Sequence, residues 1–233
     1  MFSAKKDIFF DLDHTIWDFD LNARETLHEL YGKYQFGDLT GESNSDKFIE
    51  TYTMNNHRLW NLYHHEQIDK QTLRRARFED TFQQLGIDPK TFPWKFEQDY
   101  LAICPTKTNL FPHAHETLAY LHSKYNLHLI SNGFREACEM KLNHCKLRPY
   151  FQTIVISEVI GVNKPNPKIF QYAINNGNTR TENAVMIGDS IDADVRGAQN
   201  AGIDAIYFNA VGAQRPTDVK HMITDLKELQ SLF

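Results

Sequence analysis

Short runs of apolar and β-branched residues recur along this chain, and each ends in a cluster of polar residues. They are Asp7–Leu12, Leu127–Ile130, Thr153–Ile156, Ala184–Ile187 and Ala205–Phe208. Runs this short, apolar on both faces, are typical of strands buried in a parallel sheet. Apolar residues between them recur at helical spacing over His113–Tyr125, Ile169–Ile174, Val195–Ala201 and Thr224–Leu232. The alternation predicts an α/β fold with a doubly wound, mainly parallel sheet.

One long interval interrupts this alternation. No convincing strand lies between Asp13 and Leu127, and four stretches there have helical patterns: Asn22–Tyr34, Ser45–His64, Asp69–Leu85 and Phe92–Ala102. An insertion of roughly ninety residues is too long for a simple crossover between parallel strands. We therefore expect a helical cap domain, residues 17–103, over the carboxyl end of the sheet. Residues 1–16 and 104–233 would form the core domain.

The composition and charge of the chain limit the kinds of molecule that the protein is expected to bind. The formal net charge of −5 argues against binding to a nucleic-acid polymer, which requires a basic surface. No apolar stretch approaches the length of a membrane span, and the apolar run near the N-terminus is too short for a signal peptide. The three cysteines, Cys104, Cys138 and Cys145, show no CxxC spacing. Such sparse cysteines suggest a reducing compartment, so we expect a cytoplasmic protein without a membrane partner.

The first polar cluster whose side chains could bind a ligand or take part in a reaction is Asp11-Leu12-Asp13-His14-Thr15, directly after the first predicted strand. Alternate positions at a strand end can bring two carboxylates near one point. Because like charges repel, Asp11 and Asp13 together suggest a bound cation. Taken alone, the cluster is equally compatible with a turn in which Asp13 and Thr15 cap the next segment.

A second cluster, Ser131-Asn132-Gly133, follows the second predicted strand. A small hydroxyl side chain followed by Asn and Gly exposes backbone N–H groups at the start of a helix, which suits an anion. By itself this cluster is more often an ordinary turn between a strand and a helix. We therefore interpret Ser131 and Asn132 as candidate phosphate-binding residues only in combination with the other clusters.

Lys164 lies in the third cluster, where Pro165 and Pro167 follow it. The prolines fix the backbone and favour a helix that starts near residues 165–168. A lysine at a fixed position is a point charge suited to a phosphate group. The alternative is a solvated surface lysine, which is the usual situation for this residue type.

The fourth cluster places Asp189 after the fourth predicted strand, and Asp194 about one helical turn later. Carboxylates suit Mg²⁺, whereas Asp192 fits the alternative of a charge that stabilises a helix N-terminus. Ligands of open α/β sheets bind outside the carboxyl ends of the strands. Unrelated capping turns would not be expected to supply these aspartates, a serine and a lysine at that edge together.

The four clusters, in this order, resemble those of the haloacid dehalogenase superfamily of phosphohydrolases, and the resemblance covers nearly the whole chain. The insertion resembles the type 1 helical cap of that superfamily. The stretches DLDHTIWDFD, ISNGF, VISEVIGVNKPNPKIFQYA and MIGDSIDADVRGAQNAG are similar to its noncanonical pyrimidine nucleotidase branch, as are Leu59-Trp60 and Arg77-Phe78. His14 stands where the superfamily pattern commonly has Gly, and we do not interpret it as a metal ligand or general base.

The resemblance implies an Mg²⁺-dependent phosphatase that hydrolyses a small phosphorylated metabolite through an aspartyl-phosphate. It makes Asp11 the nucleophile and Asp13 the general acid and base. It assigns Mg²⁺ to Asp11, Asp189 and the Asp13 backbone carbonyl. It assigns the phosphate to Thr15, Ser131, the Asn132 backbone N–H and Lys164, and Thr15 would also orient the loop. Asp194 would position Lys164 or a metal-bound water.

The resemblance leaves the substrate open. Pyrimidine nucleoside 5′-monophosphates are the leading candidates, a sugar phosphate or another small ester is the second, and a silent phospholigand-binding protein is the third. Trp17, Phe19, Trp60 and Tyr63 could stack on a base, and we expect at least two of them to be packing residues instead. The sequence indicates no oligomeric state.

Overall fold

The computed structural model describes residues 2, 4–41, 45–91 and 93–233, and the chain divides into two compact units. The core unit comprises Met1–Asp18 and Thr108–Phe233, and the helical unit comprises Phe19–Lys107. The junctions lie slightly later in the chain than residues 17 and 104, where the sequence analysis placed them. Trp17 belongs to the core unit because its backbone bridges Leu110.

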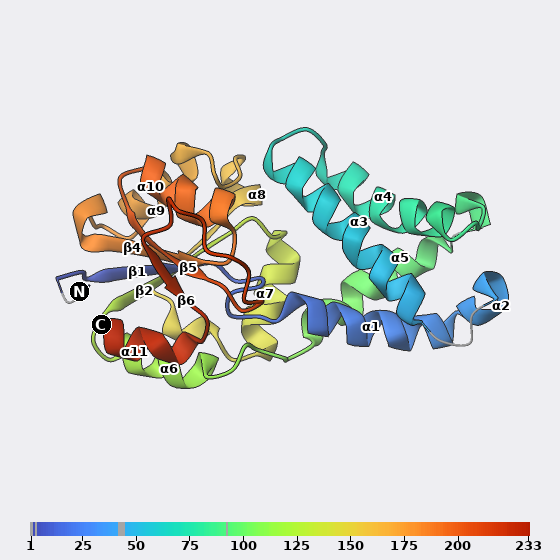
Figure 1. Ribbon diagram of the computed structural model, residues 1–233, viewed down its shortest axis with the longest axis horizontal. Helices are drawn as coiled ribbons and strands as arrows, with labels where there is room; N and C mark the ends of the chain where they lie inside the picture. The colour runs from blue at the N-terminus through green and yellow to red at the C-terminus, as the bar shows by residue number, and fades with distance from the viewer. Residues whose placement is uncertain (1, 3, 42–44, 92) are drawn as a thin grey trace. The chain divides into compact units, whose positions relative to one another are not determined.

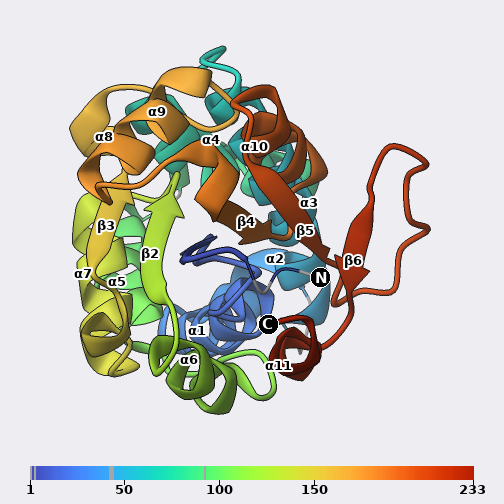
Figure 2. The ribbon, with the colours of Figure 1, turned by 90° about the vertical axis from the view of Figure 1, so that its left-hand side faces the viewer.

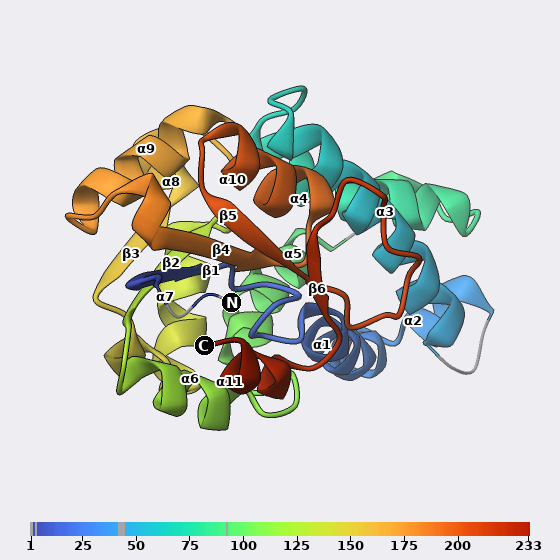
Figure 3. The same ribbon diagram turned by 60° about the vertical axis from the view of Figure 1, so that its left-hand side comes forward.

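The core unit is built on one parallel sheet (Figure 1). Its strands are β1 (Asp7–Phe10), β2 (Asn126–Ser131), β3 (Thr153–Ile156), β4 (Ala184–Gly188), β5 (Asp204–Phe208) and β6 (His221–Ile223). Their order is β3-β2-β1-β4-β5-β6, and each neighbouring pair is parallel. The predicted doubly wound sheet is confirmed. The sequence analysis missed β6, the edge strand that Figure 3 shows beside β5.

Strand β1 lies in the middle of the sheet, where all four of its residues are buried. Phe10 is in register with Leu129 of β2 on one side and with Ile187 of β4 on the other. The chain therefore reverses its winding direction around β1, which makes this a topological switch point. Side chains that follow β1, β2 and β4 emerge at the same edge of the sheet.

Helices cover both faces of the sheet. They are α6 (Ala114–His122), α7 (Arg135–His144), α8 (Ser157–Ile160), α9 (Pro167–Asn176), α10 (Gly197–Asn200) and α11 (Leu229–Leu232). Figure 2 shows α8, α9 and α10 on one face and α6 and α11 on the other. Helical turns also form at Arg148–Tyr150 (η3), Thr181–Asn183 (η4) and Leu226–Glu228 (η6).

The helix predicted over Val195–Ala201 begins earlier than expected. A π-helix, η5 (Ile191–Arg196), precedes α10. Its N-cap, Ser190, accepts a hydrogen bond from the Ala193 backbone N–H at 3.1 Å. This early start places Asp194 inside a helical turn, close to the end of β4. Wide helical turns of this kind occur frequently at functional sites.

The helical unit contains α1 (Phe19–Lys33), α2 (Phe36–Thr40), α3 (Asp46–His64), α4 (Lys70–Gln84) and α5 (Trp94–Ile103), with turns η1 (Pro89–Thr91) and η2 (Cys104–Thr106). Buried aromatic rings form its interior. The ring of Phe36 lies 5.0 Å, centre to centre, from the rings of both Phe82 and Phe96. The short α2 was not predicted from sequence. Within the described ranges, no helix has both the length and the apolar character that a membrane crossing requires.

Phe170 on α9 is fully buried in a cluster that includes Phe9 of β1 and Val195 of η5. A Cβ atom at Gly197 would lie only 2.9 Å from the Phe170 ring, so the glycine lets the helix approach closely. This packing fixes the helices that follow Lys164 and Asp189 against the sheet.

We expect Phe170→Ala to lower the free energy of unfolding of the core unit by about 3–5 kcal/mol, through lost burial and a residual cavity. Urea denaturation followed by circular dichroism would measure the change. Tyr172→Ala is the matched control on the same helix, because Tyr172 is 45% exposed. An equal loss of stability in both variants would contradict the packing described.

Candidate active site

Asp11 lies one residue beyond β1, at the switch point of the sheet. Its backbone N–H donates to the carbonyl oxygen of Ile187 at 2.9 Å, which continues the pairing of β1 with β4 by one residue. Its carboxylate is buried, and Oδ1 accepts a hydrogen bond from Lys164 Nζ at 2.6 Å. Asp11 is therefore held at a fixed position with one oxygen paired to a cation.

Lys164 is 2% exposed, so the structure contradicts the alternative of a solvated surface lysine. Its ammonium group donates to Asp11 Oδ1 at 2.6 Å, to Asp194 Oδ1 at 2.6 Å and to the Ile130 carbonyl oxygen at 2.7 Å. Asn132 holds its backbone, because the Lys164 N–H donates to Asn132 Oδ1 at 2.8 Å and Asn132 Nδ2 donates to the Lys164 carbonyl oxygen at 2.9 Å. The second and third clusters of the sequence are thus joined directly.

Asp189 and Asp194 complete the same group of side chains. The Asp189 backbone N–H donates to Thr15 Oγ1 at 3.1 Å, and that hydroxyl donates to Asp189 Oδ1 at 3.3 Å. The Ser190 backbone N–H donates to Asp194 Oδ2 at 3.0 Å. A Cβ atom at Gly188 would lie 2.3 Å from Asp194 Cγ, so only glycine leaves room for this carboxylate. The hydrogen bonds of the Thr15 hydroxyl with Asp189 thus connect the first and fourth clusters.

The charges in this group do not balance. Carboxylate oxygens of Asp11, Asp189 and Asp194 all lie within 4.8 Å of one another, and Lys164 pairs with only two of these groups. Burial raises the pKa of Asp11 well above its ordinary value; Lys164 opposes this shift, and Asp194 and Asp189 add to it. Burial and the neighbouring Asp194 raise the pKa of Asp189 to about 8.

These residues fit a divalent cation. The oxygen donors are hard ligands of the kind that Mg²⁺ prefers, and a cation would relieve the repulsion among buried carboxylates. Asp11 and Asp189 are the predicted side-chain ligands, and the structure brings them together. Asp194 lies in the same group, although its Oδ1 accepts a hydrogen bond from Lys164. The assignment of the Asp13 backbone carbonyl to the metal stays a prediction.

Asp13 pairs with a lysine that the sequence analysis did not identify. Lys141 on α7 is buried, and its Nζ donates to Asp13 Oδ1 at 2.5 Å. The only signal for it in the sequence is helical spacing, since Lys141 follows the apolar Cys138 by three residues and precedes Leu142. A lysine at such a position normally extends into solvent, which is why the pattern gave no reason to choose it.

Ser131 and Gly133 form a tight turn beside Asp13. The Gly133 backbone N–H donates to Ser131 Oγ at 3.0 Å. A Cβ atom at Gly133 would lie 3.1 Å from Ser131 Oγ and 3.4 Å from Asp13 Oδ2. The predicted helix follows one residue later, at α7, because Phe134 is its N-cap. Cys138 Sγ lies 3.5 Å from Ser131 Oγ, and burial raises the pKa of its thiol to about 12, which disfavours the thiolate form.

His14 has a backbone φ of 62°, in the left-handed region. This conformation explains why glycine suits the position, since glycine adopts it without a steric penalty. Histidine is among the residues that adopt it more often than most others. The His14 N–H donates to the Trp17 carbonyl oxygen at 2.9 Å, which closes this turn of the chain.

The four aromatic residues considered for base stacking divide into two pairs. Trp17 and Phe19 are buried, as expected for packing residues. Trp60 and Tyr63 on α3 are partly exposed, and their ring centres lie 5.5 Å apart. Trp60 and Tyr63 therefore remain the candidates for contact with a base.

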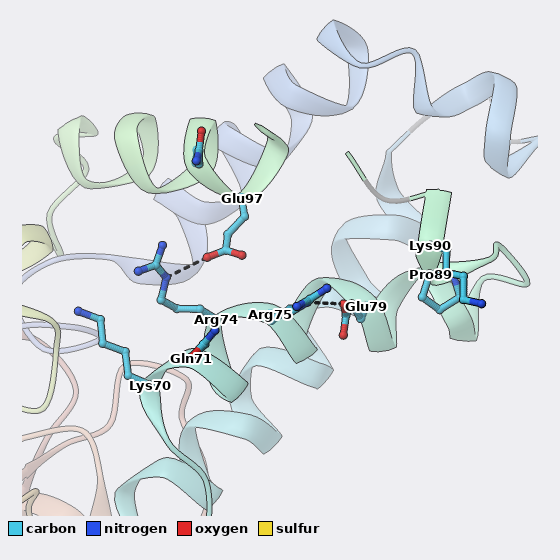
Figure 4. Close-up of a pocket in the computed structure, with 9 residues that line it drawn as sticks. Lys70, Gln71, Arg74, Arg75, Glu79, Pro89, Lys90 and Glu97 are labelled. Carbon is cyan, nitrogen blue, oxygen red and sulfur yellow. Dashed lines mark hydrogen bonds and ion pairs between the residues drawn. The ribbon is translucent and has the colours of Figure 1, made fainter. Parts of the chain in front are cut away.

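The helical unit also has a surface groove of about 840 Å³, shown in Figure 4. It is lined by Lys70, Gln71, Arg74, Arg75, Glu79, Pro89, Lys90, Glu97 and Gln98, none of which is buried. Arg74 Nε lies 2.9 Å from Glu97 Oε1, and Arg75 Nε lies 2.7 Å from Glu79 Oε1. The groove has none of the buried, converging polar groups that mark the site in the core unit.

The core unit thus combines a doubly wound parallel sheet with a buried aspartate at its switch point. The family model of the haloacid dehalogenase-like hydrolases matches residues 8–208, and the chain belongs to this family. The match spans β1 to β5, and so it includes all four polar clusters.

Individual relatives match almost the whole chain. Pyrimidine 5′-nucleotidase YjjG from Escherichia coli is 31% identical over 229 residues, which are 97% of this chain and 96% of that protein. Pyrimidine 5′-nucleotidase PynA from Streptococcus pneumoniae is 30% identical over 207 residues, 88% of this chain and 84% of that protein. The crystal structure of HAD-hydrolase YfnB from Bacillus subtilis, bound to magnesium, has a TM-score of 0.86 at 24% identity and covers 98% of each chain.

The raised pKa of Asp189 predicts how stability depends on pH without a divalent cation. The folded state holds the proton up to a pH of about 8, whereas an unfolded aspartate loses it near pH 4. Proton binding by Asp189 therefore stabilises the folded state fully below pH 4, and this contribution is lost as the pH rises toward 8. With a chelator present, the melting temperature of the native protein should fall between pH 4 and pH 8 by at least about 2 °C more than that of Asp189→Asn.

Differential scanning calorimetry would measure this difference, and added Mg²⁺ should reduce it, because a bound cation stabilises the ionised carboxylates. Identical pH profiles for the native protein and Asp189→Asn would contradict the described electrostatics.

Proposed function

We propose that this chain is an Mg²⁺-dependent phosphatase that hydrolyses small phosphate monoesters, with Asp11 as its nucleophile. The observation that carries the proposal is the group formed by Asp11, Lys164, Asp189 and Asp194 at the switch point, with Asp13 two residues beyond the nucleophile. A carboxylate held by an ammonium group near further carboxylates suits attack on phosphorus when a cation is bound.

In the first step, a carboxylate oxygen of Asp11 forms a bond to phosphorus, and the bond from phosphorus to the leaving oxygen breaks. Asp13, as the neutral acid, gives its proton to that oxygen, so an alcohol leaves and an aspartyl-phosphate remains. In the second step, Asp13 takes a proton from water as the water oxygen attacks phosphorus. Inorganic phosphate leaves, and Asp11 and Asp13 return to their starting states.

The remaining groups stabilise charge on the transferring phosphoryl oxygens. Lys164, the Ser131 hydroxyl and the Asn132 backbone N–H are assigned to these oxygens, since such transition states spread charge over them. The Asn132 side chain has a separate role, because it holds the Lys164 backbone. Bound Mg²⁺, with Asp11 and Asp189 as side-chain ligands, would offset charge between the nucleophile and the phosphate.

Asp13 distinguishes this chemistry from cleavage of a carbon–halogen bond. A halide ion leaves without a proton, so a dehalogenase has no use for a general acid at this position. An alkoxide does need a proton, and Asp13 lies beside the Ser131–Gly133 turn, where it could supply one. Phosphate ester hydrolysis is therefore the favoured reaction.

The proposed substrates are pyrimidine nucleoside 5′-monophosphates. The support is the similarity over nearly the full chain to two proteins named pyrimidine 5′-nucleotidase. This similarity extends over the helical unit, which contains the partly exposed aromatic residues Trp60 and Tyr63. We assign the selection of the leaving nucleoside to the helical unit, because the described phosphoryl-handling groups all belong to the core unit.

Turnover of p-nitrophenyl phosphate with Mg²⁺ tests the catalytic residues. Asp11→Asn should abolish turnover, because the amide is not a nucleophile. Asp13→Asn should reduce kcat by about 10²–10⁴-fold, because hydrolysis of the aspartyl-phosphate still needs Asp13 as a base, while phosphate binding measured by calorimetry remains. Asp192→Asn is the matched control, an exposed aspartate near the same edge of the sheet, and should retain activity. Turnover by Asp11→Asn would remove Asp11 as the nucleophile.

A panel of phosphorylated metabolites tests the substrate class. Release of inorganic phosphate should be fastest, by kcat/KM, with uridine or cytidine 5′-monophosphates, and slower with sugar phosphates. A preference for sugar phosphates would replace the nucleotidase proposal but keep the mechanism. No Mg²⁺-dependent phosphate release across the panel would instead favour a silent phospholigand-binding protein.

A further inference from the structure

We infer that Lys141 is a positioning residue that orients Asp13 for proton transfer to the leaving group. The inference rests on the proposed phosphatase function. It concerns a residue outside the four polar clusters, and it assigns different tasks to the two oxygens of one carboxyl group.

The surroundings of Lys141 show that it is built into the site. Its side chain is buried within α7, with the residue 5% exposed, and Nζ donates to Asp13 Oδ1 at 2.5 Å. The same ammonium group lies 4.2 Å from the ring centre of Trp17, within the range of a cation–π contact. A buried lysine is costly unless it is paired, so this pair fixes both side chains.

Lys141 also connects the two ends of the loop that carries Asp13. Asp13 and Trp17 form an isolated backbone bridge, which brings the carboxylate and the indole ring to the same lysine. The Trp17 ring is itself fully buried. One ammonium group therefore holds the loop in the conformation that places Asp13 beside the phosphate-binding turn.

The two oxygens of Asp13 have different surroundings. Oδ1 accepts the hydrogen bond from Lys141, whereas Oδ2 would lie 3.4 Å from a Cβ atom built on Gly133 and so faces the Ser131–Gly133 turn. An ammonium group only donates hydrogen bonds. The carbonyl oxygen of a neutral carboxyl group is its better acceptor, so with Oδ1 bound to Lys141 we place the proton of the neutral acid on Oδ2, on the side of the proposed phosphoryl site. From there the proton passes to the leaving oxygen, and Oδ1 stays bound to Lys141.

The two buried lysines consequently have separate tasks. Lys164 pairs with Asp11 and Asp194, whereas Lys141 pairs with Asp13. Loss of Lys141 should impair proton transfer without removing a proposed phosphate ligand. That difference can be measured by changing the leaving group.

The test compares kcat/KM for uridine 5′-monophosphate and p-nitrophenyl phosphate, because this parameter reports the steps up to departure of the leaving group. The alkoxide of the nucleotide needs a proton, and nitrophenolate leaves without one. Lys141→Met should lower kcat/KM for the nucleotide by about 10–10²-fold, which is part of the usual effect of a general acid. The same substitution should lower kcat/KM for p-nitrophenyl phosphate much less. Lys141→Arg, which keeps a cationic donor, should recover part of the loss.

Two controls make the result specific. Arg135→Met removes an exposed cation from the same helix and should leave both values of kcat/KM unchanged. In the Asp13→Asn background, Lys141→Met should cause no further loss with the nucleotide, because the carboxyl group through which it acts is absent. The ratio of the two substrates within one sample does not depend on the fraction of folded protein. If Lys141→Met fails to fold, Lys141→Gln and Lys141→Arg provide the same ratio.

An unchanged ratio in active Lys141 variants would overturn the inference and leave the phosphatase proposal standing, as would a full additional loss in the Asp13→Asn background. Absence of turnover in the native protein with Mg²⁺ would instead overturn the proposed function, and this inference with it.

Discussion

The structure depends on three carboxyl groups that converge on one buried ammonium group at the end of β1. Asp11, Asp189 and Asp194 converge there, and Lys164 lies between two of them with contacts of 2.6 Å. Charges buried this closely destabilise one another unless they are paired or bind a cation. Local features of the surrounding loops accommodate this group, from the missing side chain of Gly188 to the hydroxyl of Thr15.

The same constraint connects fold to chemistry. A parallel sheet with its switch point at β1 brings residues from distant parts of the chain to one edge, and the buried pairs then fix their orientation. Lys164 donates a hydrogen bond to the proposed nucleophile, Asp11, and Lys141 donates one to the proposed acid, Asp13. Each carboxyl group that would exchange a bond or a proton is held by its own lysine. The fold therefore holds the charged side chains of the proposed site in fixed positions before any ligand is bound.

Much of this arrangement could be predicted from sequence, because strands buried on both faces leave a clear pattern. Thr153–Ile156 was predicted with its observed bounds, and the polar clusters followed the predicted strands. The edge strand β6 has only three residues, too few to produce a pattern. The π-helix was missed because helical spacing does not reveal a wider turn. Lys141 was missed because burial of a lysine depends on a partner, Asp13, that is distant in sequence.

The central claim is that Asp11 forms a covalent bond to phosphorus. The most direct measurement is to mix the protein and Mg²⁺ with a phosphate ester, quench the reaction in acid during turnover and map the phosphorylated peptide by mass spectrometry. The account predicts a phosphoryl group on the Asp11 side chain that disappears as inorganic phosphate is released. A phosphoryl group on another side chain, or turnover with inversion of configuration at phosphorus and no phosphorylated peptide, would contradict it.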